Sequence, residues 1–501
     1  AFHYLEKSKA YYLLELFKGI KAKKTVGLPD SLLEKEYELS RFIQSFKSQI
    51  HHLQNDEKQN SEKIQALSMR LMETKQKFEQ LSAYLKANHV NYYQLKYDDQ
   101  TKSIESVQND LLDNRTALIE YALSDSLLQT FLITKGQFYV FTAKIDSSFK
   151  KALATVRNEI SNTHFISDPV SSYELYTTAA WDLYQKLFLP VQTYVTEQNL
   201  SIEKLLLIPD GVLNYLPFEV LLSERVGATN MHYKDLPYLI KNYGMFYAYS
   251  ASTLSYQLEQ NTLPRFKYDV TGFAPDFHDK KQDLAPLEYH LKEMENISQF
   301  KSSKVYTHGN ATKQTFQHNF GLSKIIHFAS HAILDDQQPL YSKLMFANNE
   351  LKVFELFNAR INAEMVVLSA CNTGSGKLIK GEGIISLARG FAYAGCQSIV
   401  MTLWQMNDFA SADLMHSFYE QIAQYKSKNE ALRAAKLRYL SQSDEIKSHP
   451  YFWAGFVLQG SDAPIQLTKK SEFGWIGLAL AMLMILLFGY FLVKFIKRFN
   501  H

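Results

Sequence analysis

The chain has 501 residues, a length that favours two or three domains over one. Hydrophobic residues make up 46% and aromatic residues 14%, enough for a large core, while a formal net charge of only +3 gives no sign of a nucleic-acid-binding surface or of acidic substrates. The two cysteines, Cys371 and Cys396, exclude a fold organised by disulfides, so each thiol needs an explanation from its position.

The first hundred residues show helical spacing of apolar side chains. Apolar positions recur every three or four residues from Leu39 to Leu53 and again from Ile64 to Leu85, and the polar stretch QNDEKQNSEK separates the two runs. This pattern predicts a long helical hairpin with a coiled-coil-like seam. Its charged faces are typical of solvated surface rather than of a binding site.

The period of the pattern changes at Thr116. The runs ALIEYAL, LLQTFLIT and QFYVFTAKI are rich in β-branched and aromatic residues and predict strands, and a mostly helical stretch follows to about residue 198. Further on, strands are predicted at 204–209, 267–274, 324–330, 364–370 and 397–404, and helices at 383–395 and 412–424. Several of these strands are apolar throughout, as when both faces of a sheet are covered. The alternation therefore predicts an α/β domain with a largely parallel sheet.

The carboxyl-terminal part contains 21 residues without a charge, from Phe473 to Val493. About 20 apolar residues match the hydrocarbon thickness of a bilayer, and Trp475 and Tyr490 lie where interfacial anchors are found. We therefore expect a polar linker at 461–472 and one transmembrane helix at 473–493, with a buried core helix as the alternative. The flanking charges differ too little to fix the side of the membrane on which the main domain lies.

Two reactive side chains follow two of the predicted strands at comparable points. His331 comes just after the strand KIIHFAS, and Cys371 just after EMVVLSA. Ligands of open parallel sheets bind outside the carboxyl ends of the strands, so neighbouring strands would bring the imidazole and the thiol together. An imidazole can take the proton of a thiol and activate it as a nucleophile. The Gly-rich loop CNTGSGKLIKGEG would provide backbone N–H groups for a developing oxyanion.

Each of these residues also has a structural interpretation. A lone cysteine at a strand end is usually a small core residue, which is how we interpret Cys396. His327 and His331, four residues apart, suggest a metal pair only if they lie on a helix, whereas their segment reads as a strand. No nearby cysteine or acidic residue completes such a site, and we expect no metal. Two reactive residues at matching strand ends, one beside a Gly-rich loop, favour catalysis.

Several motifs, in order along the chain, resemble the CHAT domain family. They are LLLIPDGVLNYLPFEVLL (205–222), GFAPD (272–276), HFASH (327–331), VVLSACNTG (366–374), GEG (381–383), LARGFAYAG (387–395) and HPYFWAGFVLQG (449–460). The resemblance covers about residues 200–460, and residues 1–24 look like the end of a TPR array, as in the TPR-CHAT type.

The resemblance implies a caspase-like fold, related to caspases and separases, with an internal duplication. It assigns residues 1–100 to a helical region, 101–265 to an amino-terminal half without a dyad, and 266–460 to the catalytic half. The family dyad falls on His331 and Cys371, and the oxyanion donors would be the backbone N–H groups of Cys371 and Ala332. Many relatives have glycine in place of Ala332, whose methyl group would narrow the cleft.

Caspase-like pockets often select the side chain before the cut through acidic residues. The candidates are Asp335, Asp336, Glu382 and Asp408, and for any one of them a solvated loop acid is the alternative.

These observations predict a membrane-anchored cysteine endopeptidase that needs no cofactor. Its substrate would be a protein, a regulatory protein partner would bind the helical amino-terminal region, and nucleic acid would play no part. We expect a single-pass location in a bacterial inner membrane. The rival hypothesis is a non-enzymatic membrane signalling scaffold that uses an inactive caspase-like domain.

Overall fold

A computed structural model gives the fold of the chain. It describes residues 2–9, 13–15, 18, 29–54, 61–97, 101–227, 231–259, 266–277, 284, 286–335, 337–357, 359–370, 373–374, 376–379, 383–470, 484, 486–487, 489 and 494.

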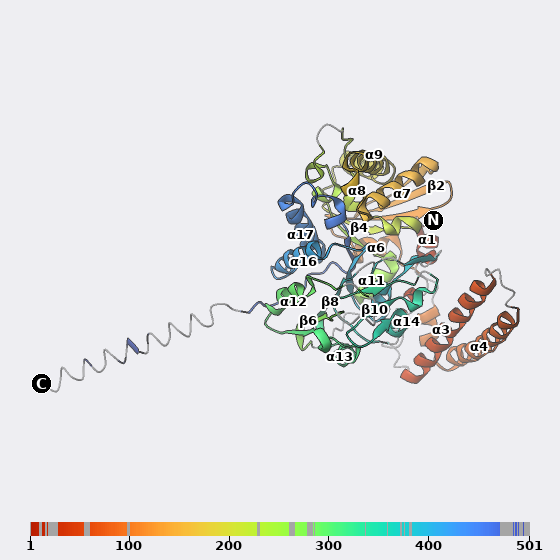
Figure 1. Cartoon of the computed structure of the whole chain (residues 1–501). Helices are drawn as coiled ribbons and strands as arrows, with labels where there is room; N and C mark the ends of the chain where they lie inside the picture. Colours follow the sequence, from red (N-terminus) through yellow and green to blue (C-terminus); the bar gives the residue numbers. More distant parts are fainter. Residues whose placement is uncertain are drawn as a thin grey trace.

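One large sheet runs through the described part of the molecule (Figure 1). Its eleven strands lie in the order β3 (Phe138–Lys144), β2 (Leu127–Ile133), β1 (Thr116–Leu123), β4 (Lys204–Ile208), β5 (Gly244–Tyr247), β16 (Phe456–Gly460), β15 (Ser398–Thr402), β12 (Met365–Ser369), β8 (Ser323–Ala329), β6 (Tyr268–Ala274) and β7 (Ser303–Thr307). Two small sheets join β9 (Ala332–Ile333), β10 (Lys343–Met345) and β11 (Glu350–Lys352), and β13 (Lys377–Ile379) with β14 (Gly383–Ile385).

The large sheet consists of two mainly parallel groups of strands. In the amino half β1, β4 and β5 are parallel, and in the carboxyl half β15, β12, β8, β6 and β7 are parallel. Strand β16 joins the halves, since it pairs antiparallel with β15 and parallel with β5. The predictions of an α/β fold with a largely parallel sheet, and of strands in the five apolar runs, are confirmed.

Helices cover the sheet on both sides. They are α7 (Ser147–Ser161), α8 (His164–Ser167), α9 (Pro169–Leu187), α10 (Leu189–Glu197), α11 (Ala251–Glu259), α12 (His290–Ser298), α13 (Lys313–His318), α14 (Val353–Leu356), α15 (Leu387–Tyr393), α16 (Asp408–Ile422), α17 (Lys428–Gln442) and α18 (Pro450–Trp453). In Figure 1, α12, α16 and α17 form one layer, and α11 and α14 lie on the other side. The α17 helix begins with a capping box in which Ser427 and Glu430 satisfy each other's backbone N–H groups.

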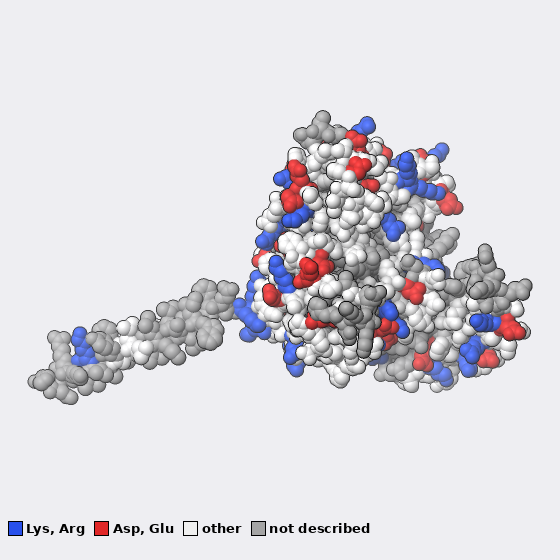
Figure 2. Space-filling model, viewed as in Figure 1, with Lys and Arg blue, Asp and Glu red and all other residues white. Residues whose placement is uncertain are grey.

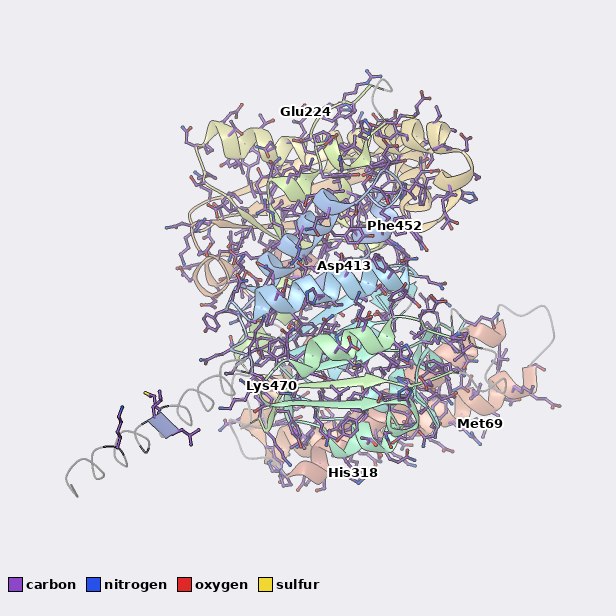
Figure 3. The ribbon with its side chains drawn as sticks, turned by 60° about the vertical axis from the view of Figure 1, so that its left-hand side comes forward. Met69, Glu224, His318, Asp413, Phe452 and Lys470 are labelled. Carbon is purple, nitrogen blue, oxygen red and sulfur yellow. The ribbon has the colours of Figure 1, made fainter. Side chains whose placement is uncertain are left out.

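Most of the described residues in the amino-terminal region are helical. It contains α1 (Phe2–Ser8), α3 (Asp30–Gln54), α4 (Ser61–Asn88), α5 (Val90–Tyr97) and α6 (Ile104–Asp110). Helices α3 and α4 lie side by side as a hairpin, and Figure 3 shows Met69 on its outer part, away from the sheet. Leu81, Leu85 and Tyr92 form a small core of their own at the base of the hairpin. The predicted region boundaries after residues 100 and 265 fall next to residues outside the described part, and they stay predictions.

Helix α1 is tied to the amino half through buried charges. Glu6 accepts hydrogen bonds from the backbone N–H groups of Ala251 and Ser252, at the start of α11. Lys9 donates to the carbonyl oxygen of Tyr121 at 2.6 Å and pairs with Glu120 at 3.1 Å. Burial raises the pKa of Glu120 well above its usual range. Breaking this cluster would leave buried charges without partners, so α1 is held firmly against the sheet.

The segment 383–395 differs from the helix predicted there. Residues Gly383–Ile385 pair antiparallel with β13, and α15 begins only after Ser386, whose side chain accepts from the N–H of Arg389. The apolar run GIISLARG does not distinguish a strand followed by a capped helix from one continuous helix. The pairing partner β13 decides between them.

The predicted membrane location is wrong. Among the described residues, no helix is both long enough and apolar enough to cross a bilayer. A crossing takes about 20 consecutive helical residues at a rise of about 1.5 Å each. The expected span 473–493 lies mostly outside the described residues, which there include only Met484, Leu486, Leu487 and Gly489.

On the face in view in Figure 2, described basic and acidic residues are interspersed.

A buried ion pair joins the helical layer to the amino half. Lys436 on α17 donates to Glu219 at 3.0 Å, and the two side chains are only 1% and 4% exposed. Glu219 lies on the short helix η2 (Phe218–Val220), and its other oxygen accepts from the hydroxyl of Tyr247 at the end of β5. The carboxylate is therefore satisfied on both sides, in a place where an uncompensated charge is costly.

We predict that Lys436→Met lowers the free energy of unfolding by about 3–5 kcal/mol, because Glu219 then stays buried without its cation. Urea denaturation of the full chain measures this change. The double variant Lys436→Met/Glu219→Gln should recover much of the loss. Lys447→Met, which removes an ion pair whose side chains are 50% and 59% exposed, should change stability by no more than about 1 kcal/mol. An equal effect of the two single variants would contradict this account.

Candidate active site

The two strands that precede the predicted dyad are direct neighbours. Strands β8 and β12 pair in parallel with Ala329 opposite Ser369, so both end at the same level of the same sheet edge. The N–H of Ser330 donates to the carbonyl of Ser369, which continues the pairing by one residue. The chain segments that carry His331 and Cys371 therefore leave the sheet side by side. Cys371 itself lies outside the described residues.

His331 is half-buried at the turn between β8 and β9. Its carbonyl oxygen accepts from the N–H of Met345 at 2.9 Å, and its ring lies 4.8 Å from the ring of the buried Phe277. Ala332 follows at the start of β9, opposite Leu344 of β10. Alternate residues of an antiparallel strand direct their N–H groups away from the partner strand. The backbone of His331 forms the hydrogen bond to β10, through Met345. The N–H of the next residue, Ala332, is therefore directed away from β10.

Thr402, the last residue of β15, holds the chain on both sides of Cys371. Its hydroxyl donates to the carbonyl of Ala370 at 2.6 Å, and its N–H donates to the hydroxyl of Thr373 at 3.1 Å. The N–H of Gly374 donates to the carbonyl of Thr402 at 2.8 Å. A Cβ on Gly374 would lie 3.0 Å from the side chain of Met401, so this close approach favours glycine.

A buried network of hydrogen bonds connects β8 and β12 to the helices α12 and α16. The ring nitrogens of His327 contact the hydroxyl of Tyr419 and a carboxylate oxygen of Glu293, each at 2.9 Å. The other oxygen of Glu293 accepts from the hydroxyl of Ser369 at 2.9 Å. Burial, together with the charge of Glu293, raises the pKa of Tyr419. With both ring nitrogens engaged, His327 holds α12, α16, β8 and β12 together.

The four candidate pocket acids have different positions. Asp335 accepts from the N–H groups of Gln337 and Gln338 and so stabilises its own turn. Asp336 and Glu382 lie outside the described residues. Asp408, in the first turn of α16, accepts from the N–H of Glu288.

Asp408 lines a small cavity of about 30 Å³, enough for about one water molecule, between the strand ends. Ser330, Ser369 and Ala370 also line this cavity. Burial raises the pKa of Asp408, and the hydrogen bond from the N–H of Glu288 acts in the opposite direction. Asp408 therefore shares a cavity with Ser330, the residue that precedes the candidate base in the chain. Sequence spacing alone did not separate it from the other three acids.

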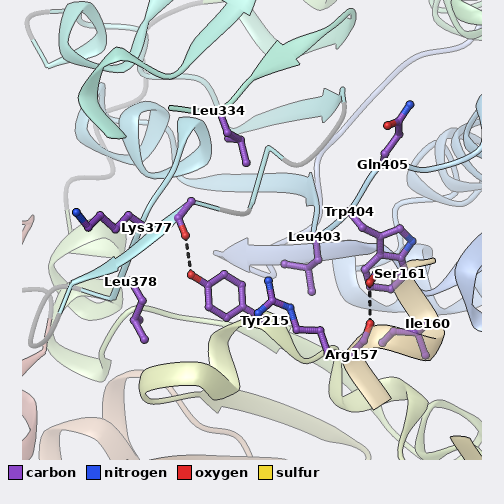
Figure 4. A pocket seen from close by; sticks show the side chains of 11 residues that line it. Arg157, Ile160, Ser161, Tyr215, Leu334, Lys377, Leu378, Leu403, Trp404 and Gln405 are labelled. Carbon is purple, nitrogen blue, oxygen red and sulfur yellow. Dashed lines mark hydrogen bonds between the residues drawn. The ribbon is translucent and has the colours of Figure 1, made fainter. Parts of the chain in front are cut away.

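A larger cavity of about 550 Å³ opens beside the strand ends (Figure 4). It lies between α7 with the short helix η1 (Gly211–Tyr215) of the amino half and the segments after β9 and β15 of the carboxyl half. Its lining residues are Arg157, Ile160, Ser161, Tyr215, Leu334, Gly376, Lys377, Leu378, Leu403, Trp404 and Gln405.

Tyr215 crosses this cavity toward the loop that contains the candidate nucleophile. Its hydroxyl donates to the carbonyl of Gly376 at 2.6 Å, and the guanidinium carbon of Arg157 lies 4.1 Å from the centre of its ring. Both residues belong to the amino half, which our sequence analysis left without a role at the site. Tyr215 lies within one of the family-like motifs, and this motif was the only available signal.

Cys396 is fully buried, as predicted. Its burial raises the pKa of the thiol to about 12, so the thiol stays protonated and shielded at neutral pH.

The chain is similar to known proteins in three kinds of comparison: with curated proteins, with solved structures and with protein families. The chain is 29% identical over 165 residues to tetratricopeptide repeat protein 28 of Mus musculus, and 28% identical over 159 residues to that of Homo sapiens. These matches cover 32% and 31% of this chain and 6% of each relative, so the chain spans only a small part of their length.

Among solved structures, the Saccharomyces cerevisiae separase–securin complex is similar at a TM-score of 0.44 and 11% identity, covering 87% of this chain and 36% of that one. The Arg-specific cysteine proteinase gingipain R is similar at a TM-score of 0.36 and 9% identity, covering 64% of this chain and 76% of that one.

The family comparison is more extensive. The CHAT domain matches residues 177–461, which is more than half of the chain, and includes β4, the strands that carry the candidate dyad and the segment through β16. This range also agrees with the motifs recognised in the sequence. The chain belongs to the CHAT domain family.

Proposed function

We propose that the chain is a cysteine endopeptidase that acts on protein substrates through His331 and Cys371. The parallel pairing of β8 with β12 is the observation that carries this proposal. The segments that precede His331 and Cys371 end side by side at one sheet edge because of this pairing. The larger cavity beside that edge would receive part of the substrate. Family membership supports a peptidase-related fold, and the activity itself is our proposal.

In the proposed reaction, His331 takes the proton of the Cys371 thiol and the thiolate attacks the scissile carbonyl carbon. The backbone N–H groups of Ala332 and Cys371 would bind the resulting oxyanion. His331 then gives its proton to the leaving amine as the C–N bond breaks and the acyl-enzyme forms. Water, deprotonated by His331, attacks the thioester, and the thiolate leaves. We retain Asp408 as the acid that faces the substrate side chain before the cut.

Regulation by a protein partner at the helical amino-terminal region belongs to the same proposal. The buried contacts of Glu6 and Lys9 join α1 to the ends of β1 and β4 and to the start of α11. The chain continues from β4 directly into η1, whose Tyr215 holds the carbonyl of Gly376. A partner that moved α1 would thus act on the loop beside Cys371 through a short series of contacts.

We expect new protein amino termini in a host-cell lysate treated with the chain, with and without candidate partners. Cys371→Ala should lower their formation by a factor of about 10³ or more, because the nucleophile is lost. Cys396→Ala, checked for folding by circular dichroism, is the matched thiol control and should keep the cuts. Cuts that persist in Cys371→Ala would disprove the assigned nucleophile.

Thiol labelling provides a second prediction that does not require a substrate. Iodoacetamide at pH 7 should label Cys371 in the native chain and leave Cys396 unlabelled, because burial raises the pKa of Cys396 to about 12. In His331→Ala, labelling of Cys371 should slow by about tenfold at this pH, because the thiol loses the group that favours its ionisation. Peptide mass spectrometry measures both rates. A Cys371 that reacts no faster than free cysteine would favour the inactive scaffold.

A third prediction concerns the support of the nucleophile loop. Tyr215→Phe removes the hydrogen bond to Gly376 and keeps the ring under Arg157. Amide hydrogen exchange in residues 376–379 should become up to about tenfold faster, which corresponds to the loss of one hydrogen bond. Tyr425→Phe, at an exposed position, serves as the control. Unchanged exchange in the Tyr215 variant would show that the bond does not restrain the loop.

A further inference from the structure

The larger cavity begins beside the candidate active site and extends toward the amino half. In the sheet, β15 lies next to β12, and Leu403, Trp404 and Gln405 follow β15 into the cavity wall. Leu334, three residues after His331, lies on the same wall. A polypeptide whose scissile bond lies at His331 and Cys371 can therefore reach this cavity within a few residues. Its volume of about 550 Å³ is in the range of ligand-binding pockets.

The charged groups of the cavity are basic. Arg157 and Lys377 line it, and none of its lining residues is acidic. Within the described ranges, no carboxylate forms an ion pair with either side chain. The ring of Tyr215 lies against the Arg157 guanidinium, with 4.1 Å from the guanidinium carbon to the ring centre, and so restricts its orientation. A cation held at the mouth of a cavity favours an anionic ligand group.

The remaining wall contains the polar side chains of Ser161 and Gln405 and an apolar part in which Trp404 is firmly held. Trp404 is 5% exposed, and its indole N–H donates to the carbonyl of Tyr451 at 3.0 Å. Figure 4 shows Leu334, Leu378 and Leu403 around the same space, with Arg157 and Tyr215 between the two halves. A ligand that matches both the cationic side chains and the apolar side chains of this cavity carries an anionic group and an apolar group close together.

We infer that this cavity is a specificity subsite for an acidic side chain of the substrate polypeptide, with Arg157 as its counter-charge and an adjacent apolar residue against Trp404. The inference rests on the proposed peptidase function and adds the class of sequence that the enzyme selects. It also gives the amino half, which lacks a dyad, a role in substrate choice. Arg157 acts here in binding, and the reacting atoms stay with His331 and Cys371.

Peptide binding tests the subsite without requiring cleavage. The full chain carrying Cys371→Ala is presented with a peptide library in which one position at a time is fixed and the others are randomised. We expect Asp and Glu to be enriched at one position with an apolar neighbour. Adding Arg157→Glu should weaken the best acidic peptide by about tenfold and shift the preference to Lys and Arg. Lys151→Glu, at an exposed position on the same helix, is the charge-matched control and should leave the preference unchanged.

The outcomes separate the subsite from the peptidase. An acidic preference that Arg157→Glu reverses supports the subsite, even if the wild-type chain cuts no protein, in which case the peptidase proposal fails alone. Cleavage by the wild-type chain with no acidic preference in the library, or a preference that survives Arg157→Glu, overturns the subsite and leaves the peptidase. A library without any selected residue also overturns it.

Discussion

The parallel pairing of β8 with β12 is the constraint on which the candidate site depends. A histidine and a cysteine about forty residues apart in sequence have no reason to meet unless the strands before them are neighbours and end at one level. The register of Ala329 opposite Ser369 meets both conditions. Thr402 then fixes the chain before and after the nucleophile position through bonds to Ala370, Thr373 and Gly374. Three adjacent parallel strands thus define the edge at which chemistry is possible.

The buried network under this edge explains the two histidines of the HFASH motif. His327 lies within β8 and is fully enclosed, with Tyr419 and Glu293 on its two ring nitrogens. His331 lies beyond the strand end, where its side chain is half-buried. The two histidines of one motif therefore have different surroundings, one enclosed in the sheet and one beyond the strand end. Glu293 also binds Ser369, so the network holds β12 as well as β8.

The amino half contributes more than a scaffold. Its strands continue the sheet of the carboxyl half through β5 and β16, and the buried Lys436–Glu219 pair fixes α17 against it. Its Arg157 and Tyr215 reach the cavity beside the strand ends. Arg157 and Lys377 place two cations at this cavity. The near-neutral net charge of the chain did not indicate them, because a total charge averages over the whole surface. The amino half therefore contacts the loop beside Cys371 through Tyr215 and forms part of the cavity wall.

Local pattern predicted most of the central strands and the family. Apolar runs predicted the central strands because parallel strands that are covered on both faces are mostly apolar. The ordered motifs predicted the CHAT domain over nearly the range that matches. The pattern failed at 383–385, where the pairing with β13 decides. It also failed at the membrane location, where an uncharged run with interfacial aromatic residues was interpreted as a span and no described helix could cross a bilayer.

Only the tertiary structure distinguished Asp408 from Asp335, and only it brought Arg157 and Tyr215 to the site. These residues come from separate elements, and their proximity depends on strand order and helix packing, which leave no local periodicity in the sequence. The sequence by itself determined which residue types can react, and the fold decided which of them meet.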